Sequence, residues 1–407
     1  MKLFLVILAI TLTSYLTLPF FGTSDMSAWV RSAAVNLTYG PTQAYDIYNM
    51  YYPPLSSTII WMTALISDFH YSLSWLTDYP SMAAIGPSYL PIKYSILFFL
   101  ILSLLSLYVF TGKRRLQDSL LTFFNPALLW STLILGYIDI YIVPALILSY
   151  DCFNKKKDFF AGALLAITFL IKLIPIFLVP VFFIAYTNLR FQPFKLRIAW
   201  HRLIKFSLGL TLVTFMTFVL YSPRSFGNIL VMSALHGQYL SLNSLNIYWL
   251  IREFFIPENL TPSIFLYLGK ILFLGISGLS LIKLALSHDK GEAILRTSFC
   301  ILFNYAMLYT GAHENHLFPA VIIALLMYFQ SPTIQNKIWY YGISVILFLN
   351  LFLFYRLGIG VPAPWLDLLF ANTPVKLLVI DLVAAGAVIF YLYQVYDEIK
   401  KSLSHLS

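Results

Sequence analysis

Charged side chains are scarce in this chain of 407 residues, where Lys, Arg, Asp and Glu together make up only 11%. Soluble domains usually carry about 25% charged residues, so the composition excludes a globular protein surrounded by water. Hydrophobic residues instead reach 60%, and the mean hydropathy is +0.80. Apolar runs recur along nearly the whole chain, and about 20 such residues suffice for a helix to cross a bilayer. The sequence therefore predicts an integral membrane protein.

Cysteine is rare as well, with Cys152 and Cys300 as the only two. Their separation offers neither a disulfide framework nor the spacing of metal ligands. The formal net charge of +9 comes from short basic clusters between apolar runs, not from a basic face, so no nucleic-acid partner is expected. The sequence gives no sign of a cofactor.

We predict an all-α polytopic fold of about 12 transmembrane helices in a single membrane domain, residues 1–407. The apolar stretch 158–188 is divided at Lys172 and Pro175, because proline interrupts a helix. The first helix is expected to be retained, with a cleaved signal peptide as the alternative. The predicted spans are 3–21, 91–111, 119–136, 138–151, 158–171, 173–188, 203–221, 262–285, 294–311, 316–330, 338–355 and 375–396.

The basic residues set the predicted orientation. With the N-terminus inside, 18 of the 26 Lys and Arg residues fall on the inner side and 8 on the outer side, as cytoplasmic loops prefer. Both termini are then cytoplasmic, in a plasma or bacterial inner membrane, or in the ER membrane of a eukaryote. A separate crossing by residues 54–69 would reverse that ratio, so this segment is predicted to be juxtamembrane, re-entrant or half of a hairpin. The long segments 22–90, 222–261 and 356–374 become extracytoplasmic, where we expect the chemistry.

The segment 22–90 begins with an isolated carboxylate, Asp25. Ser24 or Asp25 is compatible with a plain helix cap, but the residues that follow suggest more. A Tyr39–Gly40 turn comes next, and a box of sequence YYPPL ends the pattern at residues 51–55.

This pattern resembles the GT-C superfamily, membrane glycosyltransferases that use sugars linked to polyprenyl or dolichyl phosphate. Asp25 differs from the first Asp of many relatives, because its neighbours Ser24 and Met26 are not acidic. Further short motifs are similar to those of the polyprenol-phosphate-mannose-dependent branch and of related dolichol-linked transferases, and they extend over most of the chain. They are Gly136–Asp139, Lys172 with Pro175 and Pro180, Asn243–Leu245 with Arg252, and His313–His316 ahead of Phe318 and Pro319.

The resemblance implies an inverting transfer of one sugar, mannose or another hexose, from a polyprenyl-phosphate donor to a glycan, lipid or protein acceptor outside the cytoplasm. Asp25 would act as the general base, and cationic or polar groups would bind the leaving phosphate or the sugar. No metal is expected, since Asp25 lacks an acidic neighbour and the His box lacks the zinc-helix spacing. The candidate substrate-binding residues are Arg252, Arg356, His313, Glu314, His316, Lys172, Asp139, His236 and Tyr52.

Other interpretations stay open. Lys172 is equally compatible with an interfacial anchor, and the His box with helix-end capping. Lys93, Lys270 and Lys376 are predicted to be headgroup anchors. A transporter or lipid-linked-saccharide flippase would show repeated halves and helices broken within the membrane. A non-catalytic scaffold subunit would keep the fold and tolerate the loss of Asp25.

Overall fold

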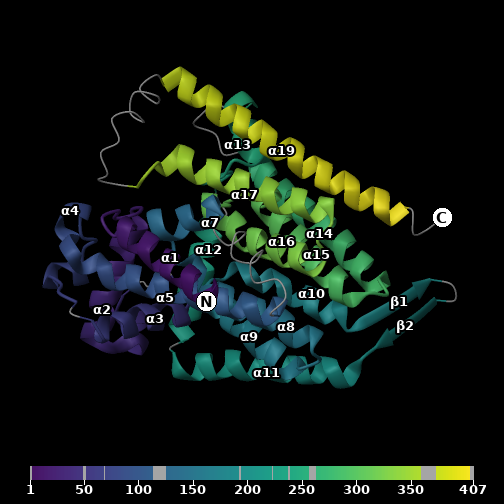
Figure 1. Cartoon of the computed structure of the whole chain (residues 1–407), viewed down its shortest axis with the longest axis horizontal. Helices are drawn as coiled ribbons and strands as arrows, with labels where there is room; N and C mark the ends of the chain where they lie inside the picture. Colours follow the sequence, from purple (N-terminus) through teal and green to yellow (C-terminus); the bar gives the residue numbers. More distant parts are fainter. Residues whose placement is uncertain are drawn as a thin grey trace. The chain divides into compact units, whose positions relative to one another are not determined.

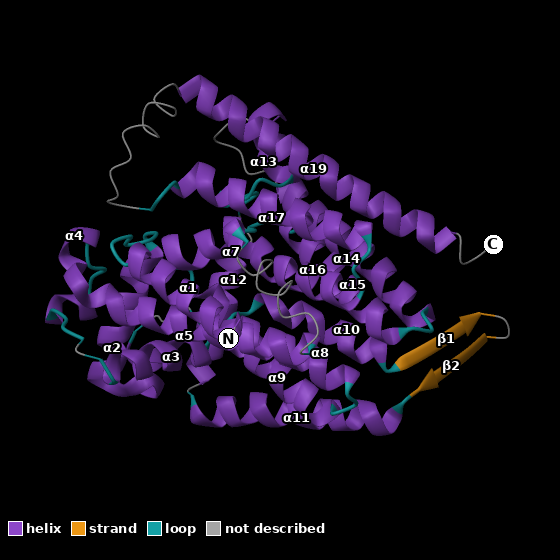
Figure 2. Ribbon diagram, in the orientation of Figure 1, coloured by secondary structure: helices purple, strands orange, loops and turns teal. Residues whose placement is uncertain are grey.

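The computed structural model describes residues 2–48, 52–67, 69–112, 125–191, 194–221, 223–236, 239–255, 263–358 and 373–403, most of them helical (Figures 1 and 2). Short 3-10 helices and one π-helix, Trp130–Ile134, connect several of the α-helices. The α-helices are α1 Lys2–Thr17, α2 Asp25–Ile47, α3 Pro54–Leu65, α4 Met82–Ile85, α5 Leu90–Thr111, α7 Pro126–Leu129, α8 Val143–Asn154, α9 Asp158–Ile171, α10 Val179–Ala185, α11 Trp200–Leu220, α12 Pro223–His236, α13 Ile247–Phe255, α14 Ser263–Leu286, α15 Lys290–Leu308, α16 Phe318–Gln330, α17 Ile334–Tyr355 and α19 Thr373–Leu403.

Several of these helices are long and apolar enough to cross a bilayer. The described residues contain five such spans, and a sixth if the pair Pro126–Ile134 and Ile138–Asn154, bent by 111°, counts as one crossing. The chain is thus a helical membrane protein, whereas the twelve crossings stay a prediction. The five are Ala83–Thr111, Trp200–Leu220, Ile264–Leu286, Ile334–Tyr355 and Pro374–Lys400.

The helix positions agree well with the sequence prediction. Each of the predicted spans overlaps a helix, and the apolar stretch 158–188 is interrupted at Lys172 as expected. Residues 119–124 of one predicted span and 262 of another lie outside the described residues, as do 359–372 of the last predicted loop. The segment 54–69 forms the 12-residue helix α3, which is too short to cross a bilayer as a straight helix.

One element was not anticipated from the sequence. Strands β1, Thr187–Phe191, and β2, Phe194–Ile198, form an antiparallel hairpin in which Asn188 pairs with Arg197 (Figure 2). The two strands directly follow α10, where the apolar run ends. Alternation of polar and apolar residues predicts a strand, but over only five residues it is a weak signal next to a long apolar run.

The chain divides into two compact units. The first unit contains residues 1–176, 204–232 and 355–362, and the second contains 177–203, 233–354 and 363–407. In the first unit α8 packs against α5 and α9, and α2 packs against α3. Helices α9 and α11 cross closely, since a methyl group at Gly162 would collide with the Phe206 carbonyl, and one at Gly209 with the Phe159 carbonyl. Small residues permit this approach in membrane proteins.

The second unit is built around α15, which packs against α14 and α16, while α13 packs along α19 (Figure 1). A charged group joins three of these helices near their predicted cytoplasmic ends. Arg296 on α15 forms ion pairs with Asp397, at 2.7 Å, and with Glu398 on α19, and Lys283 of α14 contacts Glu398 at 2.6 Å. These mutually compensating charges tie the helix ends together.

Candidate functional site

Helix α2 begins at the predicted catalytic residue. Asp25 is its first residue and is half-buried, and Ser24 before it has helical dihedral angles and makes no side-chain capping bond. Trp29 lies one turn further along the same face and is only 1% exposed. The Tyr39–Gly40 motif is a kink in this helix, where Gly40 has φ +78°.

Helix α2 also positions the YPPL box. The Asn36 side-chain amide donates to the Ser57 hydroxyl at 2.8 Å and to its carbonyl at 3.2 Å, which ties α2 to α3. The Tyr45 hydroxyl donates to the carbonyl of Tyr52. The two prolines start α3, a position that proline favours because its missing N–H needs no partner there. Tyr51 of the box lies outside the described residues.

Trp29 connects the YPPL box with the predicted Gly136–Asp139 turn. Its ring centroid lies 6.3 Å from that of Tyr52 and 6.4 Å from that of Tyr137. Tyr137 in turn packs edge-on against Tyr355, at 6.3 Å. Segments distant in the sequence therefore meet at one aromatic group in the first unit.

The Gly136–Asp139 turn lies at the bend of the broken helix pair. Gly136 has φ +70°, a backbone conformation that favours glycine. The Thr23 N–H donates to the Leu135 carbonyl at 3.1 Å, which fixes the bend against the start of α2.

Lys93 of α5 holds the broken helix end. Its Nζ donates to the carbonyls of Leu133, at 2.7 Å, and Ile134, at 3.3 Å, and the residue is 5% exposed. The prediction of a headgroup anchor at Lys93 is therefore wrong. Carbonyls at a helix end lack hydrogen-bond donors within the helix, and the Lys93 ammonium donates to two of them.

Asp139 and Lys172 form a buried ion pair. The Asp139 side chain is 1% exposed and that of Lys172 is 16% exposed. Helix α9 ends at Ile171, and Lys172 has an extended backbone. The pairing gives Lys172 a partner within the protein, which the interpretation as an interfacial anchor did not include.

Tyr52 interacts electrostatically with both carboxylates. Burial raises the pKa of its phenol well above the usual value, and the Asp25 and Asp139 carboxylates raise this pKa further. Both carboxylates therefore lie within electrostatic range of the Tyr52 hydroxyl. We call Asp25, Tyr52, Asp139 and Lys172 the carboxylate cluster. All four come from the predicted set, and the structure brings them together.

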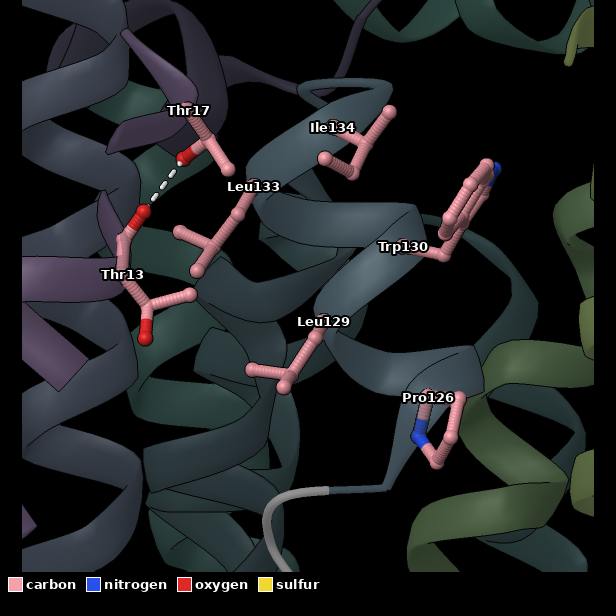
Figure 3. Close-up of a pocket in the computed structure, with 7 residues that line it drawn as sticks. All are labelled: Thr13, Thr17, Pro126, Leu129, Trp130, Leu133 and Ile134. Atoms are coloured by element: carbon pink, nitrogen blue, oxygen red, sulfur yellow. Dashed lines mark hydrogen bonds between the residues drawn. The ribbon is translucent and has the colours of Figure 1, made fainter. Parts of the chain in front are cut away.

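Arg356 also belongs to the first unit and follows α17 with φ +51°. Its carbonyl accepts a 2.9 Å hydrogen bond from the Trp130 indole, so it lies beside the broken helix pair. The same segment, Trp130 included, lines a cavity of about 250 Å³ (Figure 3). Most of its lining side chains are apolar, and the Thr17 hydroxyl already donates to the Thr13 carbonyl at 3.0 Å. Such a lining suits a hydrocarbon chain better than a sugar. The lining residues are Thr13, Thr17, Pro126, Leu129, Trp130, Leu133 and Ile134.

The second unit holds the His box on a short 3-10 helix, Glu314–Leu317. The Leu242 N–H donates to the Ala312 carbonyl at 3.1 Å, and Leu242 and Asn243 form bridges with His313. Asn243 has φ +58°, and Asn350 binds its carbonyl at 3.0 Å. The predicted Asn243–Leu245 motif and the His box are thus neighbours.

Inside the box, His316 serves the backbone. Its Nδ1 accepts a 3.0 Å hydrogen bond from the His313 N–H, which supports the capping interpretation for this residue. Glu314 is 4% exposed, with its carboxylate 3.8 Å from the His313 Nδ1. The His316 ring also lies 5.5 Å from that of Tyr305. Within the described ranges, no group of three or more His, Cys, Asp or Glu side chains is arranged to hold a metal ion.

The two remaining predicted residues of the second unit, Arg252 and His236, are not part of the His box. Arg252 is an exposed residue of α13 that contacts Glu253 at 3.6 Å and the Trp249 ring at 5.4 Å. His236 is the last residue of α12, and its side chain is outside the described part of the chain, as are Gly237 and Gln238.

No protein-family model matches the sequence, and a search of curated proteins finds no match either.

Proposed function

We propose that this chain is a membrane glycosyltransferase of the GT-C type. It transfers a single sugar, mannose or another hexose, from a polyprenyl-phosphate donor to a glycan, lipid or protein acceptor. The observation that carries the proposal is the carboxylate cluster, because Asp25, Tyr52, Asp139 and Lys172 come from separate segments and meet at one place. The apolar cavity in the same unit is compatible with a lipid-linked substrate.

In this mechanism the Asp25 carboxylate takes the proton of the acceptor hydroxyl. The acceptor oxygen then forms a bond to the anomeric carbon, and the bond from that carbon to the phosphate oxygen breaks with inversion. Negative charge grows on the departing polyprenyl phosphate and needs cationic stabilisation. Lys172 and Arg356 are the candidates in the first unit, and Arg252 is a separate candidate in the second. Asp139 orients the Lys172 ammonium, and His313, Glu314 and His316 contribute polar contacts to sugar or phosphate. His236 contributes a contact to the acceptor.

The same proposal includes the topology. About 12 crossings, with the shorter helices also embedded, put both termini in the cytoplasm and the segment 22–90 outside it. The 18-to-8 distribution of basic residues supports this orientation. The membrane is a plasma or bacterial inner membrane, or the ER membrane of a eukaryote.

The test is an assay of purified protein with polyprenyl-phosphate mannose and other hexose donors, measured by loss of the lipid-linked sugar. Asp25→Asn removes the base at nearly constant size and is expected to lower turnover by about a hundredfold or more. Asp46→Asn is the matched control, because Asp46 is an exposed carboxylate on the same helix. If Asp25→Asn keeps more than about a tenth of wild-type turnover, Asp25 is not the base. If the wild-type protein consumes none of the donors, the proposed function is wrong.

A second candidate, a transporter or lipid-linked-saccharide flippase, is favoured by one observation. The helix pair Pro126–Ile134 and Ile138–Asn154 is bent by 111° next to the ionisable pair Asp139–Lys172, as broken transporter helices are. Proteoliposomes distinguish the two, because a flippase moves the labelled lipid-linked sugar across the bilayer without breaking it down.

A further inference from the structure

Arg31 of α2 is enclosed in the first unit. It belongs to none of the motifs, but as one of the few basic residues in the predicted outer segments it is a candidate from the sequence for binding the leaving phosphate. The residue is 9% exposed, and its guanidinium lies over the rings of Tyr79, at 4.7 Å, and Tyr48, at 5.5 Å. One nitrogen, Nη2, donates to the Leu76 carbonyl at 3.2 Å. The enclosed Nε has no hydrogen-bond partner among the residues the structure describes, nor does any carboxylate among them pair with Arg31.

This environment leaves a buried positive charge without an anion. A guanidinium stays charged at any physiological pH, and burying an unpaired charge is costly. The tyrosine rings attract the cation through their faces but accept none of its in-plane N–H donors. The planar fork of an arginine matches a phosphate group, which can accept two parallel hydrogen bonds from it.

We propose that Arg31, flanked by Tyr48 and Tyr79, binds the phosphate group of a lipid. Phosphate is the anion to which a protein embedded in a bilayer is most exposed, either on a polyprenyl carrier or in a phospholipid headgroup. Tyr79, whose ring lies over the guanidinium, is 53% exposed, so this side of the Arg31 group is close to the protein surface.

The position of this site relates it to the carboxylate cluster. Arg31 lies on α2, the helix that begins at Asp25, and Tyr79 over its guanidinium lies within electrostatic range of Tyr52. A phosphate at Arg31 would hold a phosphate-linked sugar beside Asp25, and this extension rests on the proposed function. Phosphate binding itself does not depend on it.

Binding is measured without catalysis, on purified protein in a maltoside detergent, which carries no phosphate. Titration calorimetry with farnesyl phosphate, phosphatidylglycerol and inorganic phosphate compares wild type with Arg31→Gln. Arg224→Gln is the matched control, because Arg224 is an exposed arginine that also hydrogen bonds α2, at the Asp46 carbonyl. Arg31→Gln is expected to weaken the binding of a lipid phosphate about tenfold or more, since a hydrogen bond to a charged group is lost. Arg224→Gln should bind as wild type does.

A second variant covers the case in which Arg31→Gln does not fold. Tyr79→Leu changes an exposed side chain, removes one ring from the guanidinium, and should weaken lipid-phosphate binding by about threefold. Loss confined to farnesyl phosphate identifies a polyprenyl carrier, and loss confined to phosphatidylglycerol identifies a headgroup site. Affinity for both lipids that is unchanged in folded Arg31→Gln, or in Tyr79→Leu if the first variant is lost, overturns the proposal. Equal loss in Arg224→Gln also overturns it, because the effect is then one of general charge. None of these results depends on turnover, so they stand apart from the donor assay.

Discussion

The buried ion pair between Asp139 and Lys172 allows its contribution to stability to be tested separately from its contribution to activity. Removing one partner of a buried pair leaves an uncompensated charge and typically costs about 3–5 kcal/mol. The burial of these side chains, 1% and 16% exposed, puts the pair in this class. Asp139→Leu and Lys172→Met should therefore each lower the unfolding free energy by about this amount. The double variant contains no unpaired charge and should lose much less than the sum of the two.

The measurement is unfolding of the purified variants in one detergent, arranged as a double-mutant cycle. Lys155→Met is the comparison, since Lys155 pairs with Asp151 at 2.7 Å and the Lys155 side chain is 49% exposed, although that of Asp151 is only 11% exposed. Because water screens the half-exposed ammonium, this variant should lose less stability than either single variant of the Asp139 pair. Single variants of the Asp139 pair that behave like Lys155→Met would refute the reasoning, because the pair would then be solvated in the folded protein.

The double variant also tests the chemistry. If Asp139 orients Lys172 toward a leaving phosphate, a stable double variant should have lost most of its turnover. Wild-type turnover in that variant would assign the pair to structure alone, whatever its contribution to stability.

Further predictions concern topology, helix packing and the His box. Cysteines introduced at the exposed positions 79 and 156 should react with a membrane-impermeant reagent from opposite sides, outside for Tyr79 and inside for Lys156, and labelling from one side would contradict the orientation. Gly209→Leu should lower the melting temperature strongly because α9 and α11 cannot approach, whereas Gly227→Ala, with open space around it, should not. His316→Ala should cost about 1 kcal/mol of stability through loss of its bond to the His313 N–H, and His316→Asn should recover part of this if the acceptor is what matters. Reduced turnover in a fully stable His316→Asn would indicate a substrate contact.

Much of the helical architecture could be predicted because its signals are local. Apolar runs of sufficient length mark the helices of the predicted spans, and Lys172 with Pro175 marks the interruption after α9. The number of crossings could not be predicted in the same way, since α9 and α16, with 14 and 13 residues, are as apolar as the longer helices but shorter than a bilayer requires. The β-hairpin was missed because its ten strand residues carry no turn signal strong enough to stand out.

The carboxylate cluster could be predicted only as a set of residues. Motif resemblance selected Asp25, Tyr52, Asp139 and Lys172, but nothing in the sequence shows that Asp139 pairs with a lysine 33 positions away. The aromatic contact that brings Tyr52 and Tyr137 together depends on Trp29, whose only sequence signal is its position one helical turn after Asp25.

Three enclosed cations of the first unit show why the role of a basic residue depends on its neighbours. Lys93 gives its N–H donors to helix-end carbonyls, and Lys172 gives its charge to the Asp139 carboxylate. Arg31 donates to one carbonyl and lies over two tyrosine rings. Within the described part of the chain its positive charge has no anionic partner, and its Nε has no hydrogen-bond acceptor. In the sequence all three are isolated basic residues in predicted outer segments or at span ends. Only the packing around each residue distinguishes a structural cation from one that still needs an anion. Of the three, we expect Arg31 to bind an anionic ligand.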